Sequence, residues 1–527
     1  MMPPSSSTKK MRVLFIASEA DPWVKVGGLG DVTGSLPRAL RALTPEETGG
    51  VQLDVRLAIP YHSMIRQKAK NPKLLSRLTV RRGSETLTGQ VFLIENAGVP
   101  VYLVDGPPFR EGDPVYGSDP HLDGERYTYF SLAVLEAMRQ IGWAPDVVHA
   151  NDWHTALSCY WLSLNRSGDD FFRRTRALLA VHNLPFMGAG SEEATAAYGL
   201  PAASDPRLPD WARRMPLPLG LLSADHIVAV SPTYAREILT PEFGCTLESF
   251  LKTREANLSG ILNGLDLDLW NPATDALVSP FSLETLSARQ ANKQALQKEF
   301  ALDPSQNHPL YIVISRMDQQ KGIDLALQAL RELPDPNWQL ILLGTGDEIL
   351  EENARQMEKA YPDRVRAAVR FDARLARRMY AGGDVILMPS RYEPCGMAQM
   401  IAMRYGCIPL ARATGGLKDT IRDTADPATA TGFLFEKASV PALTAALQRA
   451  LRQFLFLVAD HRQSIAGIDP SGRRGRGPVI RQRRDESGSG RQRRQQRDRA
   501  MADQRGGLAA TMEVGQQAAQ GGVAQQI

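Results

Sequence analysis

The chain has 527 residues, enough for two large domains or three of average size at roughly 150 residues per domain. Hydrophobic residues make up 43% and charged residues 23%, which is typical of globular proteins and excludes a wholly disordered or fibrous chain. The net charge of +4 comes from residues 471–527, whose 12 Arg and 5 acidic residues leave the first 470 residues with a net charge of −3. The body of the chain therefore carries no charge signal for nucleic acid binding.

The sequence also lacks signals for a membrane or an export route. No apolar run reaches the length of about 18 residues that a membrane-spanning helix needs, and the N-terminus lacks the apolar segment and cleavage site of a signal peptide. The four cysteines form no CxxC pair and fit reduced thiols. They are Cys159, Cys245, Cys395 and Cys407. We therefore expect a cytoplasmic protein without a membrane partner.

The first half of the chain predicts a parallel β-sheet with intervening helices. Its short apolar runs, rich in Val, Ile and Leu, do not alternate with polar residues, which is typical of strands buried on both faces. A segment of helical length at 129–141 lies between two of them. The predicted strands are 13–17, 55–59, 91–94, 101–104, 147–150, 178–182 and 227–230.

A second series of the same kind follows a turn-rich stretch near residues 263–272. Its first helix is predicted at 323–331. We therefore expect an α/β fold of two doubly wound, Rossmann-like domains, residues 11–265 and 266–455, with ligand bound in the cleft between them, outside the carboxyl ends of the strands. The predicted strands of this series are 310–315, 340–343, 369–371, 385–388 and 408–411.

Residues 456–527 have a different texture. Residues 471–527 hold 10 Gln and 10 Gly beside the arginines and no aromatic residue, too little apolar surface to offset the entropy cost of ordering the chain. We expect a divergent, disordered tail. A shifted reading frame in the gene would produce the same texture, and an arm that binds RNA or another anionic surface is a further alternative.

Two glycine pairs stand at predicted helix starts, in residues 26–31 and 414–419. In the first, Gly27 and Gly28 let the backbone approach a ligand, and Lys25 adds a cation suited to phosphate. The segment matches neither a dinucleotide-binding fingerprint nor a P-loop. An ordinary tight turn with a surface lysine is the alternative.

Charged residues follow two strands of the second domain. Arg316 can place its guanidinium across phosphate oxygens while Lys321 acts as a point charge, although a surface charge pair is the alternative. Glu393 can bind the hydroxyls of a sugar, or else hold its own loop in place. Cys395 and Gly396 suit a pocket wall, because no histidine stands nearby in sequence to activate the thiol.

Histidines end one strand of the first domain. His149 is expected in the strand and His154 beyond it, so that the two point differently and no third metal ligand is evident. We expect His154 to donate a hydrogen bond to a sugar hydroxyl, with packing as the alternative, and Asn183 to line the same cleft. Residues 266–268 form an Asp-Leu-Asp sequence, which we interpret as a hinge turn rather than a metal site.

These residues together predict glycosyl transfer from a nucleotide sugar, in which Arg316, Lys321 and helix ends stabilise the departing diphosphate. The segments KVGGLGDV, HANDWHTAL, VHNLPFMG, SRMDQQKGIDL and PSRYEPCGMAQMIAMRYGCIPL resemble bacterial glycogen synthases, of the starch and glycogen synthase family (glycosyltransferase family 5). The resemblance spans about residues 11–455. It implies a GT-B fold, ADP-glucose as donor, the non-reducing end of an α-1,4-glucan as acceptor, and retention of configuration without a metal or other cofactor.

The resemblance also implies roles for single residues. His154 would hydrogen-bond the transferred glucose, Glu393 would hold its hydroxyls, and Arg316 with Lys321 would neutralise the diphosphate. Asp31 and Asn183 would support the loop or the acceptor. The residues expected to bind the donor are Lys25, Gly27, Gly28, Cys395, Gly396, Thr414, Gly415 and Gly416.

The chain departs from the family pattern in two places. Val26 stands where the family usually has Thr, which removes one hydroxyl group. After Phe456 the sequence lacks the aromatic helix with which the family braces the first domain. We expect an active ADP-glucose-dependent synthase; a glucan-binding protein that lost activity with this helix, and a related transferase with another donor or acceptor, are the alternatives.

Overall fold

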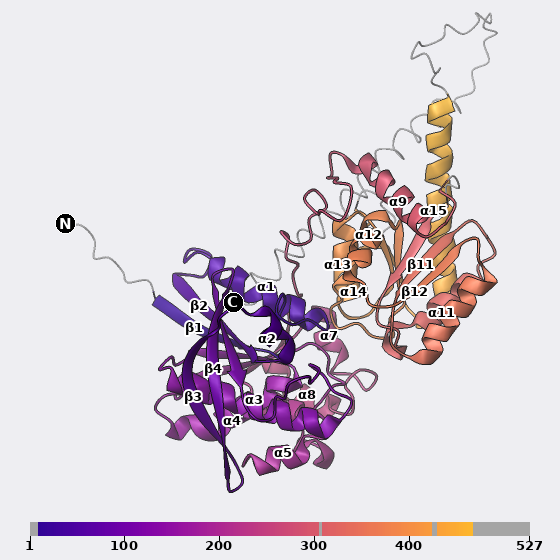
Figure 1. The fold of residues 1–527 in the computed structure, drawn as a ribbon. Coiled ribbons are helices and arrows are strands. Elements are labelled where there is room, and N and C mark those ends of the chain that lie inside the picture. The colour runs from indigo at the N-terminus through magenta and orange to yellow at the C-terminus, as the bar shows by residue number, and fades with distance from the viewer. Residues whose placement is uncertain (1–8, 305–307, 424–428, 467–527) are drawn as a thin grey trace, which may run out of the picture. The chain divides into compact units, whose positions relative to one another are not determined.

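The computed structural model describes residues 9–304, 308–423 and 429–466, with side chains up to residue 453. The chain divides between Asp266 and Leu267 into two compact units, which are described separately (Figure 1). The division lies one residue after the boundary expected between residues 265 and 266.

The first unit is built on a mixed sheet of nine strands among the described residues, in the order β3-β4-β5-β2-β1-β6-β7-β8-β9. The pairs β3–β4 and β4–β5 are antiparallel and the others parallel. The strands are β1 (Lys9–Ile16), β2 (Val51–Pro60), β3 (Lys73–Arg82), β4 (Glu85–Asn96), β5 (Val99–Asp105), β6 (Val147–Asn151), β7 (Arg176–Val181), β8 (His226–Ala229) and β9 (Leu258–Gly260).

The antiparallel edge corrects the expectation of a purely parallel sheet. Strand β3 was not predicted, because polar and apolar residues alternate from Arg77 to Arg81 in its sequence KLLSRLTVRR; of its residues only Leu78 and Val80 are buried. Such alternation belongs to a strand with one solvated face. The hairpin of β3 and β4 packs against the helix that follows β5, and the amide of Gly83 in its turn donates to the carbonyl oxygen of Ala197 at 2.7 Å. The seven strands that were predicted here are confirmed, and β9, with three residues, is too short for a clear pattern.

Helices connect these strands, and α4 packs against both α3 and α6. Helix α3 begins where the Asp119 side chain accepts the amide N–H of His121, with Pro120 in the first helical position. The helices are α1 (Gly28–Ala42), α2 (Ser63–Lys68), α3 (Pro120–Gln140), α4 (Trp153–Asn165), α5 (Glu192–Ala197), α6 (Pro216–Ser223), α7 (Pro232–Glu237) and α8 (Glu248–Lys252), with short 3₁₀ turns η1 (Arg166–Gly168), η2 (Asp210–Ala212) and η3 (Glu255–Asn257).

The second unit has a parallel sheet of six strands in its described part, in the order β12-β11-β10-β13-β14-β15. The predicted strand 369–371 is wrong, because β12 ends at Val369 and Phe371 lies beyond it. Arg366 and two alanines dilute the apolar run that marks the other strands. The strands are β10 (Leu310–Ile314), β11 (Gln339–Gly344), β12 (Val365–Val369), β13 (Val385–Met388), β14 (Ile408–Arg412) and β15 (Phe433–Phe435).

Helix-capping aspartates begin two helices of this unit. Asp347 accepts the amides of Ile349 and Leu350 at 2.9 and 3.1 Å, and Asp372 accepts that of Leu375 at 2.8 Å. The helices are α9 (Arg289–Glu299), α10 (Ile323–Arg331), α11 (Glu348–Ala360), α12 (Ala373–Gly382), α13 (Ala398–Arg404), α14 (Gly415–Thr420) and α15 (Val440–Ala466), with 3₁₀ turns η4 (Leu286–Ala288) and η5 (Gln319–Lys321).

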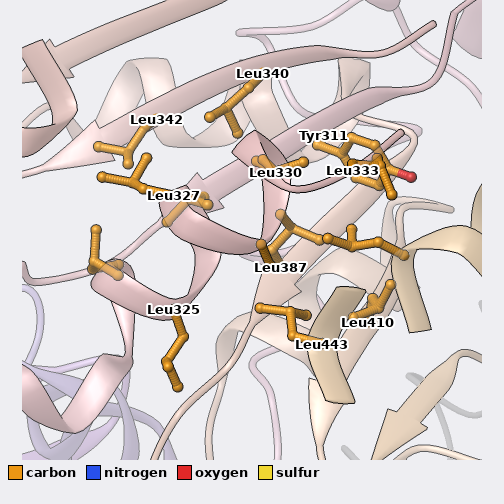
Figure 2. Packing of buried hydrophobic residues seen from close by; sticks show 14 of the residues in the cluster. Tyr311, Leu325, Leu327, Leu330, Leu333, Leu340, Leu342, Leu387, Leu410 and Leu443 are labelled. Carbon is orange, nitrogen blue, oxygen red and sulfur yellow. The ribbon is translucent and has the colours of Figure 1, made fainter. Parts of the chain in front are cut away.

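The core of the second unit forms where α10 and α15 cover one face of the sheet. Figure 2 shows Leu327 and Leu330 of α10 beside Leu340 and Leu342 of β11, with Leu443 of α15 in the same cluster. All five side chains are at most 4% exposed. Each contributes about 1.5–3 kcal/mol by its removal from water, so this packing holds the strand ends of the unit in place.

Helix α15 corrects the expected start of the tail at residue 456. It continues to Ala466, because residues 456–466 contain neither Gly nor Pro, and Gly467 and Pro470 follow only afterwards. The rest of the predicted tail lies outside the described residues.

Candidate functional site

Ligands bind doubly wound sheets at the carboxyl ends of the strands, where the strand order reverses. In the second unit this switch point lies between β10 and β13, which are neighbours in the sheet although β11 and β12 separate them along the chain. In the first unit it lies between β1 and β6. Most of the predicted site residues directly follow these four strands.

A lysine and a glutamate meet at the switch point of the second unit. Lys321 Nζ donates to Oε1 and Oε2 of Glu393 at 2.8 and 2.7 Å, and Ser390 Oγ donates to Oε2 at 2.9 Å. Glu393 is 5% exposed, whereas the Lys321 side chain is 20% exposed. The carboxylate is therefore inside the protein, and the lysine side chain that pairs with it keeps partial access to solvent.

Close backbone contacts hold the loop that carries Glu393. Gly322 has φ +66°, and a Cβ there would lie 2.2 Å from the carbonyl oxygen of Pro389. Gly415 has φ +46°, and a Cβ there would lie 1.9 Å from the carbonyl oxygen of Glu393. No side chain fits at either position, so the loop after β13 is clamped between the starts of α10 and α14.

These contacts explain the second glycine pair without a ligand. The amide of Gly416 donates to the carbonyl oxygen of Glu393 at 3.1 Å, and a Cβ on Gly416 would lie 2.2 Å from the carbonyl oxygen of Cys395. A phosphate contact of the Gly416 amide would have to replace this hydrogen bond. Phosphate binding by Thr414, Gly415 and Gly416 stays a prediction.

Cys395 and Gly396 lie in the clamped loop. Cys395 is 4% exposed, and its carbonyl oxygen accepts the side-chain amide of Gln399 at 3.0 Å. Gly396 has φ +71°, and Gln399 Nε2 donates to its carbonyl oxygen as well, at 3.0 Å. The pair is shaped by α13 from behind, which is compatible with the predicted pocket wall.

Arg316 differs from Lys321 in its surroundings. Its side chain is 58% exposed and its Nη2 lies 3.3 Å from Asp318 Oδ2. Asp318 also accepts the amide N–H of Lys321 at 3.0 Å, which begins η5. The guanidinium is thus presented to solvent just beyond β10, where it is accessible to an anionic ligand.

The first glycine pair begins a helix, as predicted. Helix α1 starts at Gly28 and α14 at Gly415, so both predicted helix starts are confirmed. Lys25 Nζ forms an ion pair with Asp31 of α1 and lies 3.9 Å from Asp21 Oδ2. Asp31 therefore supports the loop lysine, whereas contact of Lys25 with a donor phosphate stays a prediction.

A buried carboxylate beneath this loop was missed by the sequence analysis. Glu19 is 2% exposed; its Oε2 accepts the amide N–H of Val26 and, at 3.2 Å, that of Gly27. Tyr116 donates to Oε1 at 3.1 Å. The Gly27 amide N–H is therefore already hydrogen-bonded within the protein. The predicted contact of Gly27 with the sugar donor would have to use other atoms of this residue. The available signal is an acidic residue three positions after the last residue of a continuous apolar strand.

Asn151 and Asp152 hold the connection between β6 and α4 in the first unit. Asn151 Nδ2 donates to the carbonyl oxygen of Ile16 at 3.0 Å, which ties β6 to β1. Asp152 Oδ1 accepts the amides of His182 and Asn183 at 2.6 and 3.2 Å, which ties the start of α4 to the end of β7. These two residues have structural roles that position His154 and Asn183.

We expect Asp152→Asn to stabilise the protein above neutral pH. Burial raises the pKa of Asp152 from 3.8 to about 7, against the opposing effect of the two amide donors. The folded state holds the proton of Asp152 more tightly than the unfolded state does. The stabilisation of the folded state by the protonated Asp152 is therefore complete below about pH 4 and is lost as the pH rises through 7. Asn keeps an oxygen acceptor for the amides and carries no charge.

Thermal unfolding of both proteins between pH 5 and 8.5 tests this. The Tm of Asp152→Asn should exceed that of the wild type by an amount that grows up to about pH 7. A Tm difference that is negative at pH 8, or independent of pH, would show that the folded protein stabilises the ionised carboxylate.

Three histidines near the switch point of the first unit are neutral. Burial lowers the pKa of His149 to about 3, that of His182 to about 4, and that of His154 well below its usual value. His149 lies in β6 as expected, and His154 lies in the first turn of α4. The Nδ1 atom of His154 has no hydrogen-bond partner among the described residues. A neutral imidazole suits the predicted hydrogen bond to a sugar hydroxyl, which stays a prediction.

Asn183, like His154, has a buried polar atom without a hydrogen-bond partner among the described residues. Its Oδ1 is buried and lacks a hydrogen-bond partner in the described part of the chain. The predicted role beside the acceptor or the loop stays open to test.

An exposed aromatic residue at the edge of the second sheet was also missed. Phe371 is 83% exposed and follows β12, whose carboxyl end lies two strands from that of β10. The sequence analysis placed it inside a strand. An aromatic face without covering side chains, at the ligand-binding edge of a sheet, is suited to stacking on a planar ring.

Within residues 9–304, 308–423 and 429–466, no group of three or more His, Cys, Asp or Glu side chains is arranged to hold a metal ion. Asp266 of the Asp-Leu-Asp sequence is ion-paired with Arg38 at 2.8 Å. None of the described helices is both long and apolar enough to cross a membrane.

Family models match most of the chain. Residues 12–253 match the starch synthase catalytic domain, and residues 296–462 match glycosyl transferases group 1. The two matched segments correspond to the two compact units.

Curated relatives and solved structures agree with these matches. A glycogen synthase of Aromatoleum aromaticum is 40% identical over 468 residues, which cover 85% of this chain and 91% of the relative. One of Lactiplantibacillus plantarum is 40% identical over 78% and 85% of the two chains. The catalytic domain of starch synthase IV from Arabidopsis thaliana, bound to ADP and acarbose, has a TM-score of 0.76 at 31% identity, with 85% and 92% coverage.

Proposed function

The chain belongs to the glycogen synthase family of glycosyltransferases, and on that premise we propose that it transfers glucose from ADP-glucose to the non-reducing end of an α-1,4-glucan with retention of configuration. The solved starch synthase IV domain that it resembles holds ADP and acarbose. This occupancy supports a nucleotide donor and a glucan acceptor for the present chain.

The observation that carries the proposal is the arrangement at the switch point of the second unit. Exposed Arg316 and partly exposed Lys321 follow β10, and the buried Glu393 follows the adjacent β13. Two cations and a sugar-binding acid at one ligand-binding edge suit a sugar diphosphate.

The chemistry follows from these groups. The bond between the anomeric carbon and the diphosphate oxygen breaks, and an acceptor hydroxyl oxygen bonds to the same carbon and releases its proton to solvent. The diphosphate leaves with an added negative charge, which Arg316 and Lys321 neutralise. Glu393, oriented by Lys321 and Ser390, accepts hydrogen bonds from the glucose hydroxyls, and Phe371 offers a face for the base.

The proposal includes no metal or other cofactor, because the two cations can perform the electrostatic task at the diphosphate. It also includes a cytoplasmic location, supported by four cysteines that form no disulfide. Nucleic acid is not a proposed partner, since residues 1–470 carry a net charge of −3.

Transfer of labelled glucose to glycogen by the purified 527-residue chain tests the function, with ADP-glucose and UDP-glucose compared and with a chelator present or absent. We expect incorporation from ADP-glucose that the chelator does not change. A folded protein that binds glucan without incorporation would contradict the proposal, and a preference for UDP-glucose would overturn the donor assignment.

A further inference from the structure

We propose that Glu19, held by Tyr116, is the positioning residue of the Lys25–Gly28 loop, an inference that rests on the proposed function of that loop in donor binding. Glu19 is not expected to touch the substrate. It acts through the backbone of the loop, from the side opposite to solvent.

The Glu19 side chain binds backbone amides of the loop and not the side chains of the loop. Oε2 accepts the amide N–H groups of both Val26 and Gly27. Val26 is 51% exposed, so the carboxylate beneath it anchors a loop segment whose own side chain contributes little packing. Hydrogen bonds to a charged acceptor are about twice as strong as neutral ones. The carboxylate is therefore the main internal anchor of the loop backbone.

The helix start leaves room for this carboxylate. A Cβ on Gly30 would lie 3.0 Å from Glu19 Oε2 and 3.3 Å from the Cα of Lys25. A side chain at position 30 would therefore press on Glu19 and on the loop together. Thr33 Oγ1 donates to the carbonyl oxygen of Glu19 at 2.5 Å, which fixes the backbone of Glu19 to α1.

Tyr116 fixes the second carboxylate oxygen. It donates to Glu19 Oε1 at 3.1 Å and lies 2.8 Å from Ser18 Oγ. Burial raises the pKa of Tyr116 well above 10, so the phenol keeps its proton. Because the phenol O–H donates its hydrogen bond to Glu19, the Ser18 hydroxyl must donate to the phenol oxygen. Each of these two hydroxyl groups therefore has one defined hydrogen-bond direction.

The same tyrosine contacts the predicted catalytic histidine. The Tyr116 ring centroid lies 4.9 Å from that of His154. Glu19 and Tyr116 therefore connect the loop after β1 to the imidazole after β6, across the switch point of the first unit. A shift of the loop by 1 Å would cost about 100-fold in rate if donor and histidine must be aligned.

The test compares Glu19→Ala, Glu19→Gln and Tyr116→Phe. Glu19→Gln keeps an oxygen for the loop amides, so it should retain kcat/KM for ADP-glucose within about threefold. Glu19→Ala should lose about 100-fold in kcat/KM for ADP-glucose with an unchanged KM for glucan. Tyr116→Phe should show a smaller loss that does not add to that of Glu19→Ala, since both remove one network.

Asp54→Ala is the matched control for lost stability alone. Asp54 is a 6% exposed acid of the same unit, in β2, where it pairs with Arg41 at 2.8 Å. It should lower the Tm without changing the KM for ADP-glucose. If Glu19→Gln were as impaired as Glu19→Ala, or if Asp54→Ala reproduced the kinetic loss, the positioning role would be wrong.

Hydrogen exchange separates this proposal from the function itself. The amides of Val26 and Gly27 should exchange faster in Glu19→Ala than in the wild type or Glu19→Gln, in a peptide covering residues 19–31. This readout needs no substrate. Inactivity of the wild type with ADP-glucose would overturn the proposed function, whereas unchanged exchange in Glu19→Ala would overturn the role of Glu19.

Discussion

Lys321→Ala is expected to lower both turnover and stability. Turnover should fall by about 100-fold or more, because a cation that stabilises the leaving diphosphate is lost. Stability should fall by about 3 kcal/mol, since Glu393, 5% exposed, then keeps, among the described residues, only the Ser390 hydroxyl as a side-chain hydrogen-bond partner. Steady-state kinetics with ADP-glucose and urea unfolding measure the two effects separately.

A second variant distinguishes the two causes. In Lys321→Ala combined with Glu393→Gln, the buried charge is removed along with its partner, so most of the lost stability should return. Activity should stay low, because neither the cation nor the carboxylate is restored. Recovery of activity together with stability would show that Lys321 serves only to hold Glu393 in the fold.

The sheet positions of the site could be predicted from the sequence. Buried parallel strands are marked by unbroken apolar runs, and this identified β1, β6, β10 and β13 in order along the chain. Ligands gather at the ends of such strands. The residues that follow these strands, from Lys25 to Glu393, could therefore be predicted as site residues from the sequence.

Contacts between distant segments could not be predicted in the same way. Glu19 and Tyr116 are 97 residues apart, and their pairing arises because β1 lies in the middle of the sheet. The Gly416 amide is engaged by a carbonyl from another loop, which no local pattern shows. Strand β3 was not predicted because an edge strand alternates polar and apolar residues. Local pattern identifies elements, and only the packed chain identifies partners.

Arg316→Ala is expected to affect turnover alone. The side chain is 58% exposed, and its ion pair with Asp318 is a surface interaction that contributes about 0–1 kcal/mol to stability. The Tm should therefore match that of the wild type. The kcat with ADP-glucose should fall by about 100-fold, because the guanidinium stabilises charge that develops on the diphosphate as the bond breaks.

Two further variants decide what Arg316 contributes. Arg316→Lys keeps a point charge and loses the planar pair of donors, so a recovery of about tenfold over Arg316→Ala would attribute that part to charge alone. Arg355→Ala removes another surface arginine of the second unit, 45% exposed and 3.1 Å from Glu351, and should change neither kcat nor KM.

A rise in KM for ADP-glucose at constant kcat in Arg316→Ala would contradict the prediction, since it would mean that Arg316 binds donor and transition state equally. Because Lys321 is already paired with a buried carboxylate and Arg316 is not, the guanidinium is the cation that can follow the diphosphate as its charge grows.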